Sequence, residues 1–140
     1  MALLFNLPED EPFTYSLAIS LEWKQGVIKF HEFPDGEISI RVMSEVKGQD
    51  IFFVANLHHP NEKLIKLIFF AETARANGAK SVTLIAPYLS YMRLDEVTKP
   101  GEGLTSRYFA QLLSQYFDGL MTIDPHLHRY RTLGDIYAVK

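Results

Sequence analysis

Short apolar runs along the chain predict the strands of a sheet. Residues 51–55 form a continuous apolar run and residues 82–86 are mostly apolar, a pattern typical of strands that are covered on both faces. Residues 2–7 and 120–123 are two further short apolar segments. Pro87 ends the run at 82–86, because proline cannot continue the hydrogen bonding of a central strand. These segments predict four buried strands.

Between these runs the apolar residues take a helical spacing. Phe13, Leu17 and Leu21 fall at i, i+4 and i+8, which predicts a helix that buries this face. The same periodicity predicts a second helix over about residues 62–76 and a third over about residues 104–116.

Residues 27–43 have a different pattern. Ile38, Ile40 and Val42 alternate with polar residues, and the turn tripeptide Pro34-Asp35-Gly36 precedes them, which predicts a hairpin or a bent pair of strands. The predicted order is then strand, helix, three strands, helix, strand, helix, strand. This order is typical of a three-layer α/β domain with a mostly parallel sheet flanked by helices. We expect that fold class, with a hairpin protruding near residues 34–43.

Composition narrows the class of protein. The 140 residues are 47% hydrophobic and 22% charged, as expected of one globular domain. The net charge of -3 argues against a nucleic-acid partner or a membrane surface, both of which favour a basic face. The absence of cysteine excludes disulfides, thiolate catalysis and cysteine-based zinc sites. With no long apolar run and no signal-peptide pattern, we expect a cytoplasmic domain.

A long polar loop follows the strand predicted at 82–86, and it carries Arg93 and Asp95. Ligands of open α/β sheets bind at the carboxyl ends of the strands, and arginine is a common bidentate ligand of phosphate. An arginine near an aspartate can also be a surface ion pair of little energetic weight. From the residues alone the two interpretations are about equally supported.

Two other segments have polar residues at turns or strand ends. Residues 33–37, Phe-Pro-Asp-Gly-Glu, read most simply as a plain turn. The alternative is an exposed aromatic ring with two acceptors, suited to stacking on a base. Asp124, His126 and His128 follow the last strand, where one histidine could bind a hard cation or a phosphate, or simply end the strand with its hydrogen bonds satisfied. For the pair His58-His59 we expect a structural or solvent-facing role.

Several phosphate-binding and catalytic motifs are absent. The chain has neither G-x-G-x-x-G nor G-x-x-x-x-G-K-[ST], and it has no G-x-S-x-G. The residues therefore indicate an α/β domain with a phosphate-type site and leave the reaction open.

Six ordered segments carry a resemblance to a known family. In chain order they are F-P-D-G-E-I at 33–38, E-V-K-G-Q-D-I-F-F-V at 45–54, N-E-K-L-I-K-L at 61–67, P-Y-L-S-Y-M-R-L-D at 87–95, K-P-G-E-G-L-T-S at 99–106 and T-I-D-P-H-L-H at 122–128. Together they resemble the N-terminal domain of ribose-phosphate pyrophosphokinase, also called phosphoribosyl pyrophosphate synthetase. Members of that family transfer the diphosphoryl group of ATP to ribose 5-phosphate, with Mg²⁺, giving AMP and 5-phosphoribosyl 1-pyrophosphate for nucleotide biosynthesis.

The resemblance implies roles for particular residues. It implies that Phe33 packs against adenine, and that Asp35, Gly36 and Glu37 line the edge of the base. This hairpin would serve a neighbouring subunit, which implies a homo-oligomer, either a dimer or a hexamer. It also implies that Arg93 contacts ATP, with Leu94 and Asp95 beside it, and that His126 is the metal-associated histidine.

The chain departs from the family pattern in two ways. Leu94 stands where the family has glutamine, and Glu96 and Val97 stand where it usually has basic residues. These changes fit either a divergent enzyme or a non-catalytic, regulatory homologue that acts through subunit contacts. The family's second domain, which carries the phosphoribose-binding loop and the catalytic lysine and arginine, has no counterpart within residues 1–140. We therefore expect one N-terminal, ATP-side domain that is inactive alone.

Overall fold

Five parallel strands form the central sheet of the computed structural model, which describes residues 1–139. Their order across the sheet is β2-β1-β5-β6-β7. The strands are β1 (Ala2–Asn6), β2 (Lys24–Gln25), β5 (Asp50–Val54), β6 (Ser81–Ala86) and β7 (Gly119–Thr122). The four predicted strands of this sheet are confirmed, and the two-residue edge strand β2 is an addition that no apolar run marks.

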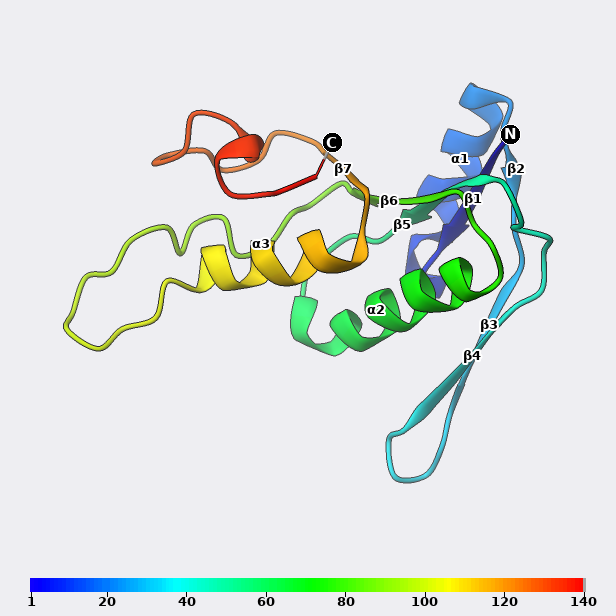
Figure 1. Ribbon diagram of the computed structural model, residues 1–140, viewed down its shortest axis with the longest axis horizontal. Coiled ribbons are helices and arrows are strands. Elements are labelled where there is room, and N and C mark those ends of the chain that lie inside the picture. The colour runs from blue at the N-terminus through cyan, green and yellow to red at the C-terminus, as the bar shows by residue number, and fades with distance from the viewer. Residues whose placement is uncertain (140) are drawn as a thin grey trace.

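Three helices cover the two faces of the sheet. Helix α1 (Glu11–Leu21) lies on one face, and α2 (Pro60–Ala76) and α3 (Thr105–Tyr116) lie on the other (Figure 1). Single 3₁₀ turns span Pro8–Asp10 and Leu133–Asp135. Within the described residues, no helix combines the length and apolarity needed to cross a membrane. The predicted three-layer α/β class is confirmed.

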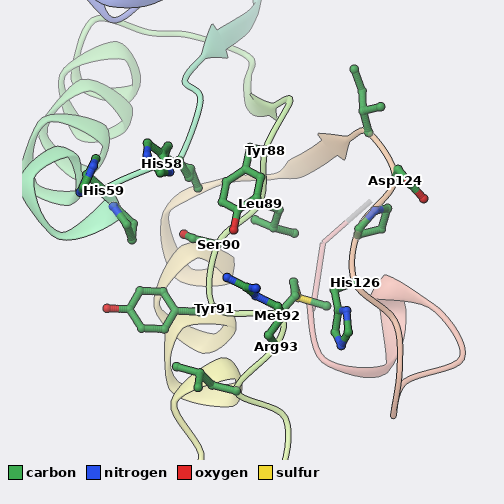
Figure 2. Close-up of a pocket in the computed structure, with 15 residues that line it drawn as sticks. His58, His59, Tyr88, Leu89, Ser90, Tyr91, Met92, Arg93, Asp124 and His126 are labelled. Atoms are coloured by element: carbon green, nitrogen blue, oxygen red, sulfur yellow. The ribbon is translucent and has the colours of Figure 1, made fainter.

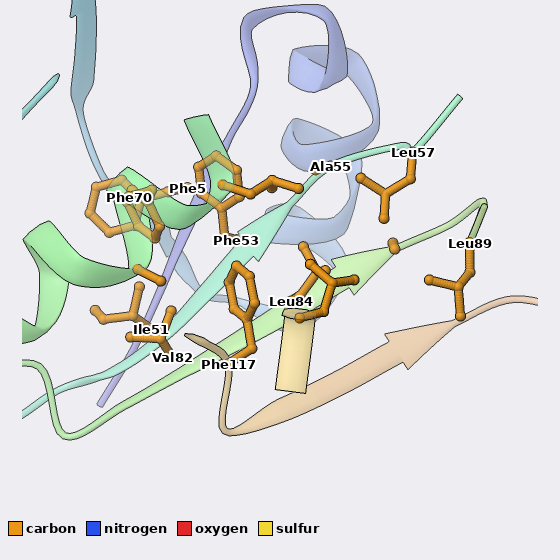
Figure 3. Close-up of a cluster of buried hydrophobic side chains, with 14 of the residues drawn as sticks. Phe5, Ile51, Phe53, Ala55, Leu57, Phe70, Val82, Leu84, Leu89 and Phe117 are labelled. Carbon is orange, nitrogen blue, oxygen red and sulfur yellow. The ribbon is translucent and has the colours of Figure 1, made fainter. Parts of the chain in front are cut away.

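Aromatic packing fills the face of the sheet that α2 covers (Figure 3). Phe53 of β5 stacks on Phe70 of α2 at 4.2 Å between ring centroids, and Phe5 of β1 meets the same ring at 5.1 Å. On the opposite face, Val54 packs in the cluster that contains Ala18 of α1. Alternate residues of β5 thus enter different layers, which explains why its sequence is apolar throughout.

Helix α1 buries a different face from the one predicted. Thr14 and Ala18 are buried, whereas Phe13 and Leu21 are 40% and 42% exposed. The small side chain of Ala18 lets the helix approach the sheet closely, and Leu17 is only partly buried beside it. The spacing of apolar residues predicted the position of the helix correctly and its buried face wrongly. The prediction relied on large apolar side chains, whereas small residues form the face that packs closely on the sheet.

The predicted hairpin is confirmed as a separate two-stranded sheet. Strands β3 (Ile28–Glu32) and β4 (Ile38–Val42) pair antiparallel, with Phe30 opposite Ile40. Both of these side chains pack against the core beside α2. The tip, residues 33–37, extends beyond the body of the domain (Figure 1). Gly36 makes the turn possible, since its φ of 91° is a conformation that side-chain-bearing residues rarely adopt.

Candidate ligand-binding site

A pocket of about 930 Å³ lies at the carboxyl ends of β5, β6 and β7. Its lining comes from three loops, one after each strand: residues 57–60, 88–94 and 123–126 (Figure 2). This volume is within the range of ligand sites, roughly 300–1,000 Å³. The location is also where open α/β sheets bind their ligands. The prediction that the loop after residue 86 forms part of such a crevice therefore agrees with the structure.

A hydrogen-bonded network beneath the pocket fixes the first loop. The carboxylate of Asp10 accepts the backbone N–H of Asn56 at 3.1 Å, and the Asn56 side chain accepts the N–H of His58 at 3.0 Å. The ammonium of Lys63 donates to the carbonyl of Asn56 at 2.5 Å. Burial raises the pKa of Asp10 above its ordinary value, while the hydrogen bond from Asn56 and the charge of Lys63 act in the opposite direction.

Buried side chains anchor the second loop. Leu89 and Met92 are 6% and 2% exposed, and Tyr91 packs on Phe109 of α3 at 4.7 Å between ring centroids. The backbone of Tyr91 has a φ of 64°, an uncommon conformation for a non-glycine residue that such packing can hold in place. With these residues turned inward, Arg93 at the end of this stretch lines the pocket.

The third loop is tied to the second by Arg129. Its guanidinium lies 3.6 Å from the carboxylate of Asp95 and 2.6 Å from that of Glu96. The Asp95 side chain is only 6% exposed, so this pair holds a largely buried carboxylate. Ser106 in the first turn of α3 and Tyr130 add a hydroxyl–hydroxyl contact of 3.1 Å, which holds the segment after His126 against that helix. The two loops that carry Arg93 and His126 are thereby held together.

Some of the predicted site residues meet in this pocket. Arg93, Leu94 and His126 all line it. Asp95 is adjacent in sequence but faces Arg129 instead of the pocket. The prediction that Asp95 contacts a nucleotide gains no support from its position, because its side chain is outside the pocket lining and one carboxylate oxygen pairs with Arg129.

The other predicted residues lie on the hairpin tip, outside the pocket. Phe33 is 43% exposed and packs edge-on against His31 at 4.7 Å. The carboxylate of Asp35 accepts the backbone N–H of Glu37 at 3.0 Å, as in an ordinary turn, and Gly36 completes it. None of these residues lines the pocket of its own chain.

The pair His58-His59 is solvent-facing, as expected, and also lies at the pocket. Both imidazoles are exposed and line the pocket, in edge-to-face contact at 4.3 Å between ring centroids. Figure 2 shows them on one side of the pocket and Asp124 and His126 on the other, with Arg93 between. The available signal was their place just after the strand at 51–55, the same signal that marked Arg93.

The charged groups of the lining favour an anion. They comprise one guanidinium, three imidazoles and a single carboxylate, that of Asp124. Arg93 makes no ion pair within residues 1–139, so its guanidinium is available to a ligand. A guanidinium can hold a phosphate by two parallel hydrogen bonds.

The same lining does not form a complete metal site. Across the described residues there is no group of three or more histidine, cysteine, aspartate or glutamate side chains that could hold a metal ion. Of His126 and His128, only His126 lines the pocket. At most His126 or Asp124 could supply a single ligand, with the phosphates of a substrate supplying others, as is common for Mg²⁺.

The parallel sheet, its helix layers and a pocket at the carboxyl ends of three strands define an α/β domain. The family model for the N-terminal domain of ribose phosphate pyrophosphokinase matches residues 2–116, and the chain belongs to that family.

Curated relatives carry the same family name. The chain is 30% identical over 135 residues to a putative ribose-phosphate pyrophosphokinase 2 of Streptococcus pyogenes serotype M6. The aligned region covers 95% of this chain and 41% of the relative. It is 40% identical over 96 residues to the ribose-phosphate pyrophosphokinase of Saccharolobus solfataricus, covering 67% of this chain and 33% of that protein. The chain therefore spans well under half the length of these relatives.

Solved structures share the fold. A phosphoribosylpyrophosphate synthetase from Mycobacterium smegmatis superposes with a TM-score of 0.88 at 23% identity, over 99% of this chain and 46% of that one. A hypoxanthine phosphoribosyltransferase from Trypanosoma cruzi, in complex with IMP, gives a TM-score of 0.50 at 12% identity, over 94% of this chain and 70% of that one. At these identities the likeness concerns the fold alone.

Proposed function

We propose that this chain is the ATP-side domain of an enzyme that transfers the diphosphoryl group of ATP to ribose 5-phosphate. The observation that carries the proposal is the pocket of a family member in which Arg93 and His126 converge from two loops. Arg93 would bind a phosphate of ATP through its free guanidinium. Phosphoryl transfer depends mainly on positioning and charge neutralisation, which such a pocket can supply.

The metal in this proposal is Mg²⁺, carried with ATP. When bound, it would neutralise phosphate charge and orient the transferred group. Because residues 1–139 contain no full set of ligands, His126 would contribute only one contact. Leu94, which is 53% exposed at the pocket, would contact the nucleotide through apolar surface instead of a hydrogen bond.

The hairpin tip completes the site from a second copy of the chain. Phe33 is exposed, and with Asp35 and Glu37 it lies outside the pocket of its own chain, which supports a role in trans. We accordingly propose a homo-oligomer, a dimer or a hexamer, in the cytoplasm, in which the ring of Phe33 stacks on adenine.

Calorimetric titration of the chain with Mg·ATP tests this function. We expect binding in the wild type and a loss of about tenfold to a hundredfold in Arg93→Ala, since hydrogen bonds to charged groups are the stronger ones. Arg41→Ala, which removes an exposed arginine outside the pocket, is the matched control and should bind normally. With ribose 5-phosphate added, the chain alone should form no AMP. Absence of ATP binding in the wild type would contradict the proposal, and turnover by the chain alone would contradict the need for a second domain.

A second candidate is a non-catalytic homologue that regulates an enzyme through subunit contacts. Two observations favour it: Leu94 presents an apolar side chain to the pocket, and the Glu96 carboxylate is engaged by Arg129 at 2.6 Å. A kinetic assay of the longest natural protein that contains this chain separates the two candidates. Turnover within the usual enzyme range, about 1–10³ s⁻¹, would reject the regulatory role.

A further inference from the structure

The N-terminus of α2 opens into the pocket without a side-chain cap. Its N-cap residue His59 and its first residue Pro60 line the pocket, and the His59 side chain makes no capping hydrogen bond. The N–H groups of a helix's first turn have no partner within the helix, and the helix dipole adds positive potential there. α2 is 17 residues long, so this potential is fully developed.

A buried hydroxyl faces the same corner. Ser90 is 6% exposed and lines the pocket, and its Oγ has no hydrogen-bond partner among residues 1–139. Figure 2 shows this hydroxyl pointing toward the side of the pocket where His59 lies. Buried hydroxyls in proteins are nearly always hydrogen-bonded, so an orphan hydroxyl at a ligand pocket indicates a partner supplied from outside.

The charges around this corner suit a phosphoryl group. The imidazoles of His58 and His59 border it, and the unpaired guanidinium of Arg93 lies in the same pocket. The carboxylate of Asp124 is on the opposite side (Figure 2). Glu62, in the first turn of α2, is not among the lining residues.

We propose that the α2 N-terminus, Ser90 and His59 form a phosphoryl-binding subsite distinct from Arg93. The hydroxyl of Ser90 donates to one phosphoryl group, and the free N–H groups of Asn61 and Glu62 behind Pro60, which has none, add positive potential, while Arg93 holds another phosphate of the same ligand. The inference rests on the proposed function in its choice of ligand, a chain of linked phosphates.

Inorganic pyrophosphate is the probe, titrated by calorimetry and by ¹H–¹⁵N NMR of the full chain. Binding should shift the backbone amide signals of His59, of residues 61–63 and of Ser90, whereas Pro60 has no N–H to observe. Ser90→Ala should weaken pyrophosphate binding about tenfold, the value of a hydrogen bond to a charged group. The variant removes a hydroxyl that has no partner, so its thermal midpoint should not fall. Ser16→Ala, at an exposed serine of α1, is the control and should bind normally.

Two substitutions at position 59 test whether the subsite binds a negatively charged group. His59→Asp and His59→Asn both remove the imidazole, and both residues tolerate the φ of 53° found there. The aspartate should reduce pyrophosphate affinity at least tenfold more than the asparagine, because only it brings a negative charge to the anion. Equal affinities in the pair, wild-type affinity in Ser90→Ala, or no pyrophosphate binding by the wild type would overturn the subsite.

Titration of the same variants with ATP separates this inference from the proposed function. If ATP affinity falls in Arg93→Ala but not in Ser90→Ala or His59→Asp, the subsite is wrong and the function stands. If pyrophosphate binding depends on Ser90 while ATP does not bind, the subsite stands and the proposed function is wrong.

Discussion

The pocket and the hairpin tip are organised in opposite ways. Around the pocket, buried side chains such as Leu89 and Met92 and the Arg129 ion pairs hold three loops in fixed positions. At the tip, residues 33–37 are all exposed and are held mainly by the hydrogen bonds of one turn. The pocket is a surface formed by the core of its own domain. The tip presents its side chains outward, as a contact for another molecule would.

The largest expected difference between the pocket and the tip is in the loss of unfolding free energy when a phenylalanine is truncated to alanine. Phe53→Ala removes a fully buried ring that stacks on Phe70, and such losses cost about 3–5 kcal/mol of unfolding free energy. Phe33→Ala at the tip should change the same quantity by less than about 0.5 kcal/mol. Urea denaturation followed by circular dichroism measures both. Similar losses in the two variants would mean that the tip is part of the folded core.

The Arg129 ion pairs should contribute a smaller amount. Arg129→Ala leaves the largely buried carboxylate of Asp95 without its partner, which should cost about 1–2 kcal/mol, given that Arg129 itself is half-exposed. Adding Asp95→Asn should recover part of the loss, and a double-mutant cycle gives the coupling. Hydrogen exchange of residues 94–103 should accelerate in Arg129→Ala, while that of the hairpin should not change.

The pattern of apolar residues predicted most elements of the fold because apolar positions are mostly the buried ones. It identified β5 and β6, the three helices and the hairpin, and it failed at α1, where Thr14 and Ala18 pack inward in place of Phe13 and Leu21. The edge strand β2 is two residues long and carries no periodicity.

The site was only partly predictable from sequence. Arg93 and His126 follow strands, and parallel topology brings strand ends together, so their convergence was accessible. The contact of Asp95 and Glu96 with Arg129 was not, because it depends on the paths of two loops with no regular repeat. For His58 and His59 the expected solvent exposure is found, and their position after a strand end accounts for their place in the pocket lining.

The smallest expected effect is on the pH dependence of stability. It concerns Asp10, which holds the first pocket loop by accepting the N–H of Asn56. Burial raises its pKa above the ordinary value of 3.8, so the protonated form is favoured in the folded state. The stability linked to this group is fully present below pH 3.8 and is lost as the pH rises through the folded-state pKa. Asp10→Asn does not titrate, so its stability relative to the wild type should rise from pH 3 to pH 7. Thermal unfolding across that range checks the sign, and a falling difference would contradict it.

Mixing two defective chains tests most directly whether the tip of one copy completes the pocket of another. Arg93→Ala lacks the phosphate contact of the pocket, and Phe33→Ala lacks the ring of the tip. If the tip serves a neighbouring copy, a mixed dimer has one site with both residues intact, and random pairing restores about a quarter of all sites. After subunit exchange, Mg·ATP titration should therefore show a fraction of sites with wild-type affinity that neither variant has alone. A mixture that binds no better than its two components would contradict a site shared between copies.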